Sequence, residues 1–505
     1  MLPAVCAFAA VCALVVMPSE PPQNAPTPVT PKPAPAPAVA PTSTTYPEPT
    51  PLSGAAILPD APYTPGRGVQ RTMSLLVQST PTHRNHVKIL VYGQSISEQD
   101  WWKQVADDLR RRFPNADLDI QNKAIGGFAS QLLIRPAEHD VYPWYPDLVI
   151  FHVYGANQEY EQITHNIRSR TTAEVLIQRD HVTKWPAPTD QLAPDKDKGA
   201  WWDDFMNNHV LPDTARKYGC GIVDIRGQWL DYLRTNHVEP KALLSDDVHL
   251  NAWGNFLMAR LISRYLVYRP ELADTVDKNS VQTLVIGRDI RWRNGRLTVP
   301  FTGNRVDLVM DTPVKPTSDG KDSHIEILVD GKKPSAFAEA YSFTRPQPNP
   351  WSPLALVRVD KGTNNTAPFV SSQTPDAPET WTLTITDVSP DFKTWDYTLS
   401  NALTGADGAG SNRAPFTSPS GRVGIAPEAF FHPNDKPIFK GYTITWQTQR
   451  NFADHFVSPP QRTIASMEQT LTAIQGIANA PHTLELIGVP FPTLRAVRVY
   501  CPPVK

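Results

Sequence analysis

The sequence predicts an α/β fold with a parallel sheet, followed by a C-terminal β-sandwich. Up to about Asp274, short apolar runs alternate with amphipathic stretches of helical period. Repeated strand–helix units of this kind imply parallel strands with helices on both faces of the sheet. After Asp274 apolar and polar residues alternate in short runs between loops rich in Pro, Gly and Asn, which is typical of a β-sandwich.

The expected strands of the first part are apolar runs that end in a polar or glycine-containing turn. They lie at 88–92, 117–121, 148–154, 173–178 and 221–225. Helical patterns follow at 97–113, 201–218, 228–236 and 253–268. Strands of the second part are expected at 304–310, 325–329, 381–386, 442–446, 483–487 and 496–500. Right-handed crossovers bring the carboxyl ends of parallel strands to one edge of the sheet, so polar residues after these strands gather there.

Ser95 is the first candidate for chemistry, because it follows the first strand in the turn Gly93-Gln94-Ser95-Ile96. Its hydroxyl is expected to face the crevice at the strand ends, in front of a helix over 97–113 whose N–H groups favour a nearby oxyanion. A plain capped turn is the alternative interpretation of this segment.

Three later segments favour a nucleophilic serine. A serine hydroxyl needs a base, and the base needs a carboxylate on its other ring nitrogen; His249 and Asp246, three residues apart, provide both. Acyl transfer also needs donors for the oxyanion. Gly127 and Asn157 each follow an expected strand, so the Gly127 N–H, the Asn157 amide and the Ser95 N–H are the candidates.

In this chain order the four segments resemble the blocks of the SGNH branch of the GDSL-type serine hydrolases. The resemblance covers about 87–268 and implies a flavodoxin-like parallel sheet, the SGNH hydrolase fold. It also implies a catalytic triad of Ser95, Asp246 and His249, and an oxyanion hole of Ser95, Gly127 and Asn157.

Two of the blocks depart from the family pattern. The first reads Gly-Gln-Ser instead of Gly-Asp-Ser, which is similar to several carbohydrate-acting members, and the third reads Gly-Ala-Asn-Gln. In the second block either Gly126 or Gly127 can supply the donor, and counting from Asn122 favours Gly127.

Four further residues are candidates for substrate contacts: Gln94, Trp101, Gly126 and His181. Trp102, Val105 and Leu109 share a helical spacing that indicates core, which leaves Trp101 as the expected wall of the cleft. His181 follows a strand and is therefore expected at the active edge.

Composition excludes several classes of function. A net charge of −2 over 505 residues, without a long basic run, argues against nucleic acid or an anionic membrane surface as partner. No spacing typical of a metal site or a phosphate-binding loop is present, so neither metal nor cofactor is expected. Cys220 and Cys501 are too few for a disulfide framework; two isolated thiols are the first interpretation and a bridge between them is the second.

The chain is expected to divide into four segments. Residues 1–17 are almost wholly apolar and indicate a signal peptide or a membrane anchor, and 18–66 form a disordered linker rich in Pro, Ala and Thr. The SGNH hydrolase domain is expected over 67–274 and the β-sandwich domain over 275–505. A secreted, periplasmic or cell-surface location follows.

The expected function is that of an exported serine esterase that works through an acyl-enzyme. The family resemblance, the export signal, the linker and the appended β domain favour O-deacetylation of an acetylated carbohydrate. Trp381 and Trp446 make glycan contact through the C-terminal domain a further expectation, although tryptophans within strands are more often core. A lipase, lysophospholipase or thioesterase, an acetyltransferase with the same triad, and a noncatalytic glycan-binding protein remain open.

Overall fold

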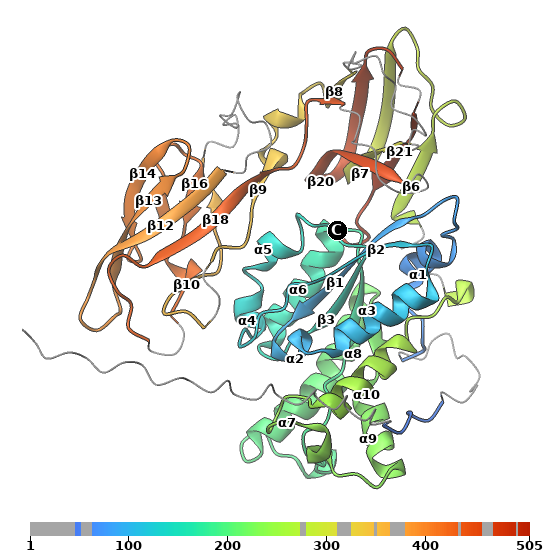
Figure 1. Ribbon diagram of the computed structural model, residues 1–505, viewed down its shortest axis with the longest axis vertical. Helices are drawn as coiled ribbons and strands as arrows, with labels where there is room; N and C mark the ends of the chain where they lie inside the picture. Colours follow the sequence, from blue (N-terminus) through green and yellow to red (C-terminus); the bar gives the residue numbers. More distant parts are fainter. Residues whose placement is uncertain are drawn as a thin grey trace, which may run out of the picture. The chain divides into compact units, whose positions relative to one another are not determined.

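The first part of the chain folds around a parallel five-stranded sheet, which confirms the expected fold class (Figure 1). The strand order β2-β1-β3-β4-β5 is the flavodoxin-like order. The chain adds β2 on one side of β1 and adds β3, β4 and β5 on the other side. Ligands of such sheets bind at this switch point, between β1 and β3. The strands are β1 His86–Gly93, β2 Asp117–Asn122, β3 Leu148–His152, β4 Glu174–Gln178 and β5 Gly221–Val223.

This computed structural model describes residues 46–51, 63–272, 279–310, 325–347, 351–363, 379–432, 436–456, 468–490 and 493–505. The expected signal or anchor at 1–17 and most of the linker at 18–66 lie outside these residues. Within the described part of the chain, no helix combines the length and the apolar character that crossing a membrane requires.

Each face of the sheet has its own apolar core, because alternate residues of a strand point to opposite faces. In β1, Val87, Ile89 and Val91 belong to one core, and Leu90 and Tyr92 to the other. The first core includes residues of α1 Gln70–Val77, α3 Trp101–Arg112, α9 Ile225–Thr235 and α10 Ala252–Ser263. The second includes residues of α4 Ser130–Leu133, α5 Ala137–Asp140, α6 Asn157–Arg170 and α8 Leu211–Tyr218. The remaining helical segments of this part include α7 Lys198–Phe205, followed by a π-helical turn at Met206–Val210.

The prediction of one helix over 97–113 is wrong in one respect, because the structure has two helices in this part of the chain. A short helix α2, Ser95–Glu98, carries the candidate nucleophile in its first position, and α3 begins at Trp101. Gln99 leaves the helical conformation with a ψ of 164°. Its side chain instead pairs with the backbone of Leu250, a contact between distant segments.

The C-terminal region consists of antiparallel sheets, as expected, but it has two separate cores. A six-stranded sheet has the order β19-β8-β20-β7-β21-β6, and a five-stranded sheet has the order β14-β13-β12-β18-β9. The five-stranded sheet is inserted in the chain between β8 and β19 of the other. The strands of the six-stranded sheet are β6 Val281–Val285, β7 Arg296–Met310, β8 Ile325–Val329, β19 His455–Phe456, β20 Gln469–Ile487 and β21 Leu494–Tyr500. Those of the five-stranded sheet are β9 Tyr341–Phe343, β12 Glu379–Val388, β13 Trp395–Asn401, β14 Gly405–Ser411 and β18 Thr443–Arg450. Short strands complete this region: β10 Ala355–Leu356 pairs with β17 Phe430–Phe431, and β16 Val423–Ile425 lies between β11 Asp360–Lys361 and β15 Phe416–Thr417.

Trp381 and Trp446 are core residues of the five-stranded sheet, with 1% and 2% of their surface exposed. They stand opposite each other on β12 and β18. The interpretation that tryptophans within strands are core is therefore confirmed for this pair, and these two side chains provide no glycan contact. Cys220 and Cys501 form no disulfide with each other in the described part of the chain.

Candidate active site

The structure brings Ser95, His249 and Asp246 into one hydrogen-bonded chain. His249 Nε2 lies 2.9 Å from Ser95 Oγ, and His249 Nδ1 lies 2.7 Å from Asp246 Oδ2. With the imidazole proton on Nδ1, the carboxylate accepts it and Nε2 is left to accept the proton of the serine hydroxyl. This is the arrangement that activates a serine for attack on a carbonyl carbon.

Asp246 is held in its charged form. The backbone N–H groups of His249 and Val248, each 2.7 Å from Oδ1, and the His249 side chain lower the pKa of Asp246 from 3.8 to about 2. Its side chain is 56% exposed and that of His249 is 38% exposed, so water also reaches this end of the triad.

Gln99 fixes the loop that carries His249. Its Nε2 donates to Leu250 O at 3.1 Å and its Oε1 accepts from Leu250 N at 3.0 Å. On the other side of His249, the Ser245 N–H donates to His249 O at 2.8 Å. Because Gln99 directly follows α2, this pairing ties the base to the turn that carries the nucleophile. No sequence signal marked Gln99 for this role.

His181 touches the same loop from its buried side. Its Nε2 donates to Val248 O at 2.8 Å, and burial lowers the pKa of His181 to about 4. The residue is 6% exposed. The expected location at the active edge is correct, but the expected substrate contact is wrong, because the ring supports the backbone of the catalytic loop.

The glycine segment after β2 offers one donor to an oxyanion. The Gly126 N–H donates to Glu98 Oε1 at 2.7 Å, so it is not available as the oxyanion donor. The Gly127 N–H has no acceptor among the residues that the structure describes, and its φ of +79° is readily adopted only by glycine. Asn122 also joins this segment to α2, because its Nδ2 donates to Ser97 O at 2.6 Å.

Asn157 and Gln94 are both available for a ligand. Asn157 is the first residue of α6, at the end of the segment that follows β3. Both side chains are half-buried, and neither amide has a hydrogen-bond partner within the described ranges. Ser95, Gly127 and Asn157 thus remain the proposed oxyanion hole, and Gln94 remains a candidate substrate contact.

Close packing of β1 against β3 sets the position of the nucleophile turn. A Cβ atom on Gly93 would lie 1.9 Å from His152 O and 2.3 Å from Ser97 Oγ. Any side chain at Gly93 would therefore push the turn away from β3 and displace Ser95.

Trp101 is not a wall of the cleft, contrary to expectation. Its side chain is fully buried, and its Nε1 donates to Ile96 O at 2.6 Å. The Trp101 N–H donates to Asn255 Oδ1 at 3.0 Å, which fixes the start of α3. Trp102 is only partly buried against the same core.

Trp351, from the C-terminal region, lies against the oxyanion segment instead. Its Cη2 atom is 3.4 Å from the point where a Cβ on Gly127 would stand, and the side chain is 57% exposed. Phe128, which follows Gly127, packs edge-on against Phe431 with ring centroids 5.5 Å apart. Trp351 therefore presents an exposed aromatic surface beside the candidate oxyanion hole.

No protein-family profile and no curated protein matches this chain. Solved structures show limited similarity. A two-domain esterase (CEX) active on acetylated mannans is 15% identical, with a TM-score of 0.34, over 86% of this chain and 97% of its own. Axe2, an acetylxylan esterase from Geobacillus stearothermophilus, is 17% identical over 39% of this chain and 100% of its own, with a TM-score of 0.31. LAE5, an α/β hydrolase from the metagenome of Lake Arreo, is 18% identical over 37% of this chain and 98% of its own, also with a TM-score of 0.31.

Proposed function

We propose that this protein is a serine esterase of the SGNH type that removes O-acetyl groups from a glycan. The observation that carries the proposal is the chain of contacts from Ser95 through His249 to Asp246, at 2.9 Å and 2.7 Å, at the carboxyl end of β1. A carboxylate held ionised, an imidazole with a defined tautomer and a hydroxyl in reach of it are the parts that acyl transfer requires.

The reaction has two halves. Ser95 Oγ attacks the ester carbonyl carbon while His249 Nε2 takes the hydroxyl proton, and the N–H groups of Ser95 and Gly127 with the Asn157 amide stabilise the oxyanion. The bond between the acyl carbon and the sugar oxygen then breaks, as His249 returns the proton to that oxygen. Water then attacks the acyl group on Ser95 with the same base, and the acid leaves while Ser95 recovers its proton.

The acetyl-glycan assignment is supported by the surroundings of Ser95. Trp351 is a planar apolar surface that matches the C–H face of a sugar ring, and an exposed triad admits a bulky alcohol. Resemblance of the blocks to carbohydrate-acting SGNH hydrolases points in the same direction. A lipase or thioesterase of the same family, which would bind a long acyl chain, is the second candidate within enzymes.

Hydrolysis of nitrophenyl esters of increasing chain length tests the reaction. We expect turnover of the acetate ester that falls with longer chains and is abolished in Ser95→Ala at unchanged melting temperature. Turnover by Ser95→Ala above a small fraction of the parent rate would end the nucleophile assignment. Preference for long chains would favour the lipase, and no turnover by the folded parent protein would favour a glycan-binding protein.

Acetate release from polymers tests the substrate class. Acetylated mannan and acetylated xylan, the substrates named for CEX and Axe2, are suitable first choices. We also propose that the protein is exported through its apolar segment at 1–17. Cell fractionation with and without this segment tests the location, and an unchanged cytoplasmic distribution would contradict it.

A further inference from the structure

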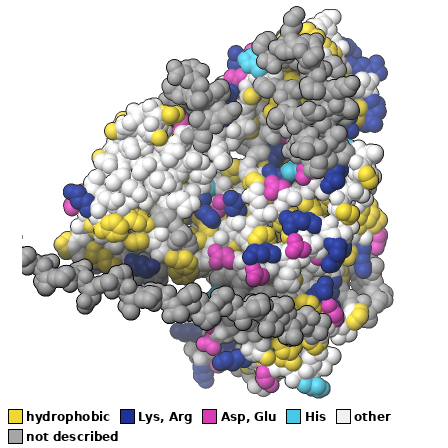
Figure 2. All heavy atoms as spheres, in the orientation of Figure 1, with side chains coloured by type: hydrophobic (Ala, Val, Ile, Leu, Met, Phe, Trp, Pro, Cys, Tyr) yellow, Lys and Arg dark blue, Asp and Glu magenta, His cyan; other side chains and the backbone are white. Residues whose placement is uncertain are grey.

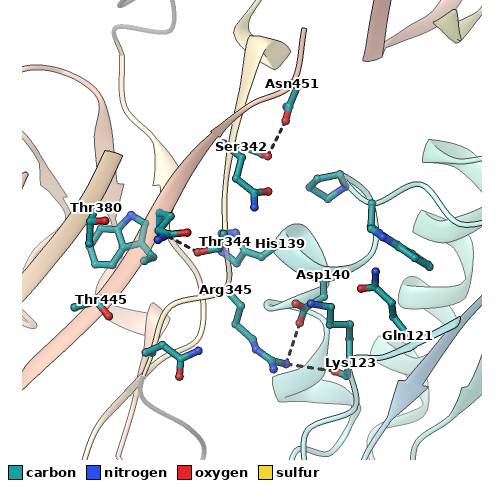
Figure 3. A pocket seen from close by; sticks show the side chains of 16 residues that line it. Gln121, Lys123, His139, Asp140, Ser342, Thr344, Arg345, Thr380, Thr445 and Asn451 are labelled. Carbon is teal, nitrogen blue, oxygen red and sulfur yellow. Dashed lines mark hydrogen bonds and ion pairs between the residues drawn. The ribbon is translucent and has the colours of Figure 1, made fainter. Parts of the chain in front are cut away.

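A polar pocket lies between the edge of the parallel sheet and the five-stranded sheet of the C-terminal region (Figure 3). Its volume is about 580 Å³. One wall comes from the end of β2 and from α5, and the other from β9, β18 and the segment after β9. Most of the lining side chains carry hydroxyl or carboxamide groups, among them Gln121, Gln347, Thr380, Thr445, Gln447 and Gln449.

Several of these groups are free to bind a ligand. The carboxamides of Gln347, Gln447 and Gln449 are exposed and have no hydrogen-bond partner among the described residues. Thr380 on β12 stands opposite Gln447 on β18, so a hydroxyl and a carboxamide lie next to each other. Both kinds of group donate and accept hydrogen bonds, as the hydroxyls of a sugar do.

The polar character of this surface follows from the strand period. In β18 the side chains of Ile444, Trp446 and Thr448 are buried, while those of Thr445 and Gln447 point to the opposite face. Figure 2 shows few charged side chains over β12, β13 and β14 in the face of the molecule that it presents. On this wall a neutral, hydroxyl-rich ligand fits better than a charged one. The charged groups that line the pocket are Lys123, Asp140 and Arg345, of which the last two form an ion pair with each other.

Both walls of the pocket are held in place by hydrogen bonds. Arg345 reaches across it, and its Nη1 lies 3.1 Å from Asp140 Oδ2 and 3.3 Å from Lys123 O, as Figure 3 shows. The Gln347 N–H donates to Thr445 O at 2.7 Å. The pocket is therefore formed before a ligand arrives, as ligand sites usually are.

Each wall leads to the candidate active site. Lys123 precedes Gly127 by four residues, and Gln347 precedes Trp351 by four residues. Four residues span at most about 14 Å, and the Trp351 ring lies against Gly127, so the two segments meet at the oxyanion hole. This end of the pocket therefore lies within about 14 Å of the oxyanion segment, measured along the chain from Lys123 to Gly127.

We propose that this pocket binds the sugar units next to the acetylated one, so that the inserted five-stranded sheet selects the glycan. The inference rests on the proposed function for its link to catalysis, but it makes a separate claim about binding. The ligand class is a neutral oligosaccharide, recognised through its hydroxyl groups.

Calorimetric binding of mannopentaose and xylopentaose to the full chain tests the claim directly. We expect one of them to bind, and the double variant Gln447→Ala/Gln449→Ala to bind it at least tenfold more weakly, because a hydrogen bond lost at each position weakens binding severalfold. Thr443→Ala is the matched control, since Thr443 is exposed on the same strand and face but does not line the pocket. Equal binding by the double variant, or no binding of either sugar by the parent protein, would overturn the proposal.

Kinetics separate this claim from the proposed function. The measured quantity is the ratio of kcat/KM on an acetylated oligosaccharide to kcat/KM on nitrophenyl acetate. We expect this ratio to fall at least tenfold in the double variant and to stay unchanged in Thr443→Ala. An unchanged ratio in the double variant would contradict the pocket. Absence of acetate release by the parent protein would contradict the glycan esterase, while the binding experiment would still decide the pocket. Gln347→Ala provides a second variant should the double variant unfold.

Discussion

Replacing Asp246 by Asn tests how the base is oriented. The carboxylate accepts three hydrogen bonds, from the backbone N–H groups of Val248 and His249 and from His249 Nδ1. An Asn side chain can still accept from the backbone with its oxygen, but it then presents its NH₂ group to His249 Nδ1. The imidazole consequently carries its proton on Nε2 and cannot accept one from Ser95.

The magnitude follows from the exposure of this pair. In a buried triad, removal of the Asp side chain lowers kcat by a factor on the order of 10⁴. Asp246 is 56% exposed, so water replaces part of its effect in Asp246→Ala. If water restores half of the transition-state stabilisation that the carboxylate provides, the loss in kcat of Asp246→Ala is the square root of 10⁴, about 10². Asp246→Asn should be worse, at about 10³, because the amide favours the wrong tautomer.

The assay is kcat on nitrophenyl acetate from pH 5 to 9, with Asp247→Asn as the control on the same loop. Because the pKa of Asp246 is about 2, its carboxylate stays charged over this whole range, and any acid limb of the profile must belong to another group. Activity of Asp246→Asn within threefold of the parent protein would refute the orienting role, and Asp246→Ala slower than Asp246→Asn would refute the tautomer argument.

Three other outcomes are expected. Asn157→Ala should lower kcat by about 10² to 10³ with little change in KM, since it removes one oxyanion donor; Gln158→Ala is the control, and a change mainly in KM would make Asn157 a ground-state contact. Trp351→Ala should lower kcat/KM on an acetylated oligosaccharide about tenfold, with recovery in Trp351→Phe, and equal loss on nitrophenyl acetate would assign Trp351 to the oxyanion segment instead. Burial lowers the pKa of His139 from 6.5 in the unfolded chain to about 4, so the unfolded chain binds its proton first as pH falls. The free energy of unfolding should therefore decrease by about 3 kcal/mol between pH 6.5 and 4 from this residue, and urea titrations in which His139→Gln keeps the full parental pH dependence would contradict it.

The sheet could be predicted because its strands are locally recognisable. Central parallel strands are buried on both faces, so β3 and β4 are nearly continuous apolar runs. The break after α2 could not be predicted, since the amphipathic pattern continues through it. It depends on the pairing of Gln99 with Leu250, a contact that local sequence does not encode.

The tryptophan pair shows the limit of helical periodicity. Trp102, Val105 and Leu109 fit one face of a helix, and Trp101 with the same two partners fits it equally well, because neighbours three and four residues apart share a face. The structure selects Trp101. What decides between them is the start of α3, fixed by the bond from the Trp101 N–H to Asn255.

The residues of the candidate triad could be predicted because Ser95 follows a strand, and Asp246 and His249 share one loop before a helix. The residues around the triad could not be predicted. Trp351 has no motif around it and reaches Gly127 only through the packing of the C-terminal region. The same holds for the pocket glutamines, which look like ordinary outward residues of a strand. Their role depends on which sheet edge they face, and that is set by contacts such as Arg345 with Asp140.

The C-terminal region also contributes residues to an apolar core of the first part. Ala355 and Val357 are buried in the same apolar core as Tyr92 and Phe151 of the parallel sheet. His139 joins the parts further: its Nδ1 donates to Phe343 O at 3.0 Å and its Nε2 accepts from Val359 N at 3.1 Å. A chain that ended at Asp274 would keep the triad residues but expose this apolar face and lose Trp351. The catalytic groups and the surface proposed to select the glycan are therefore held by one shared core, so a substitution in that core affects both.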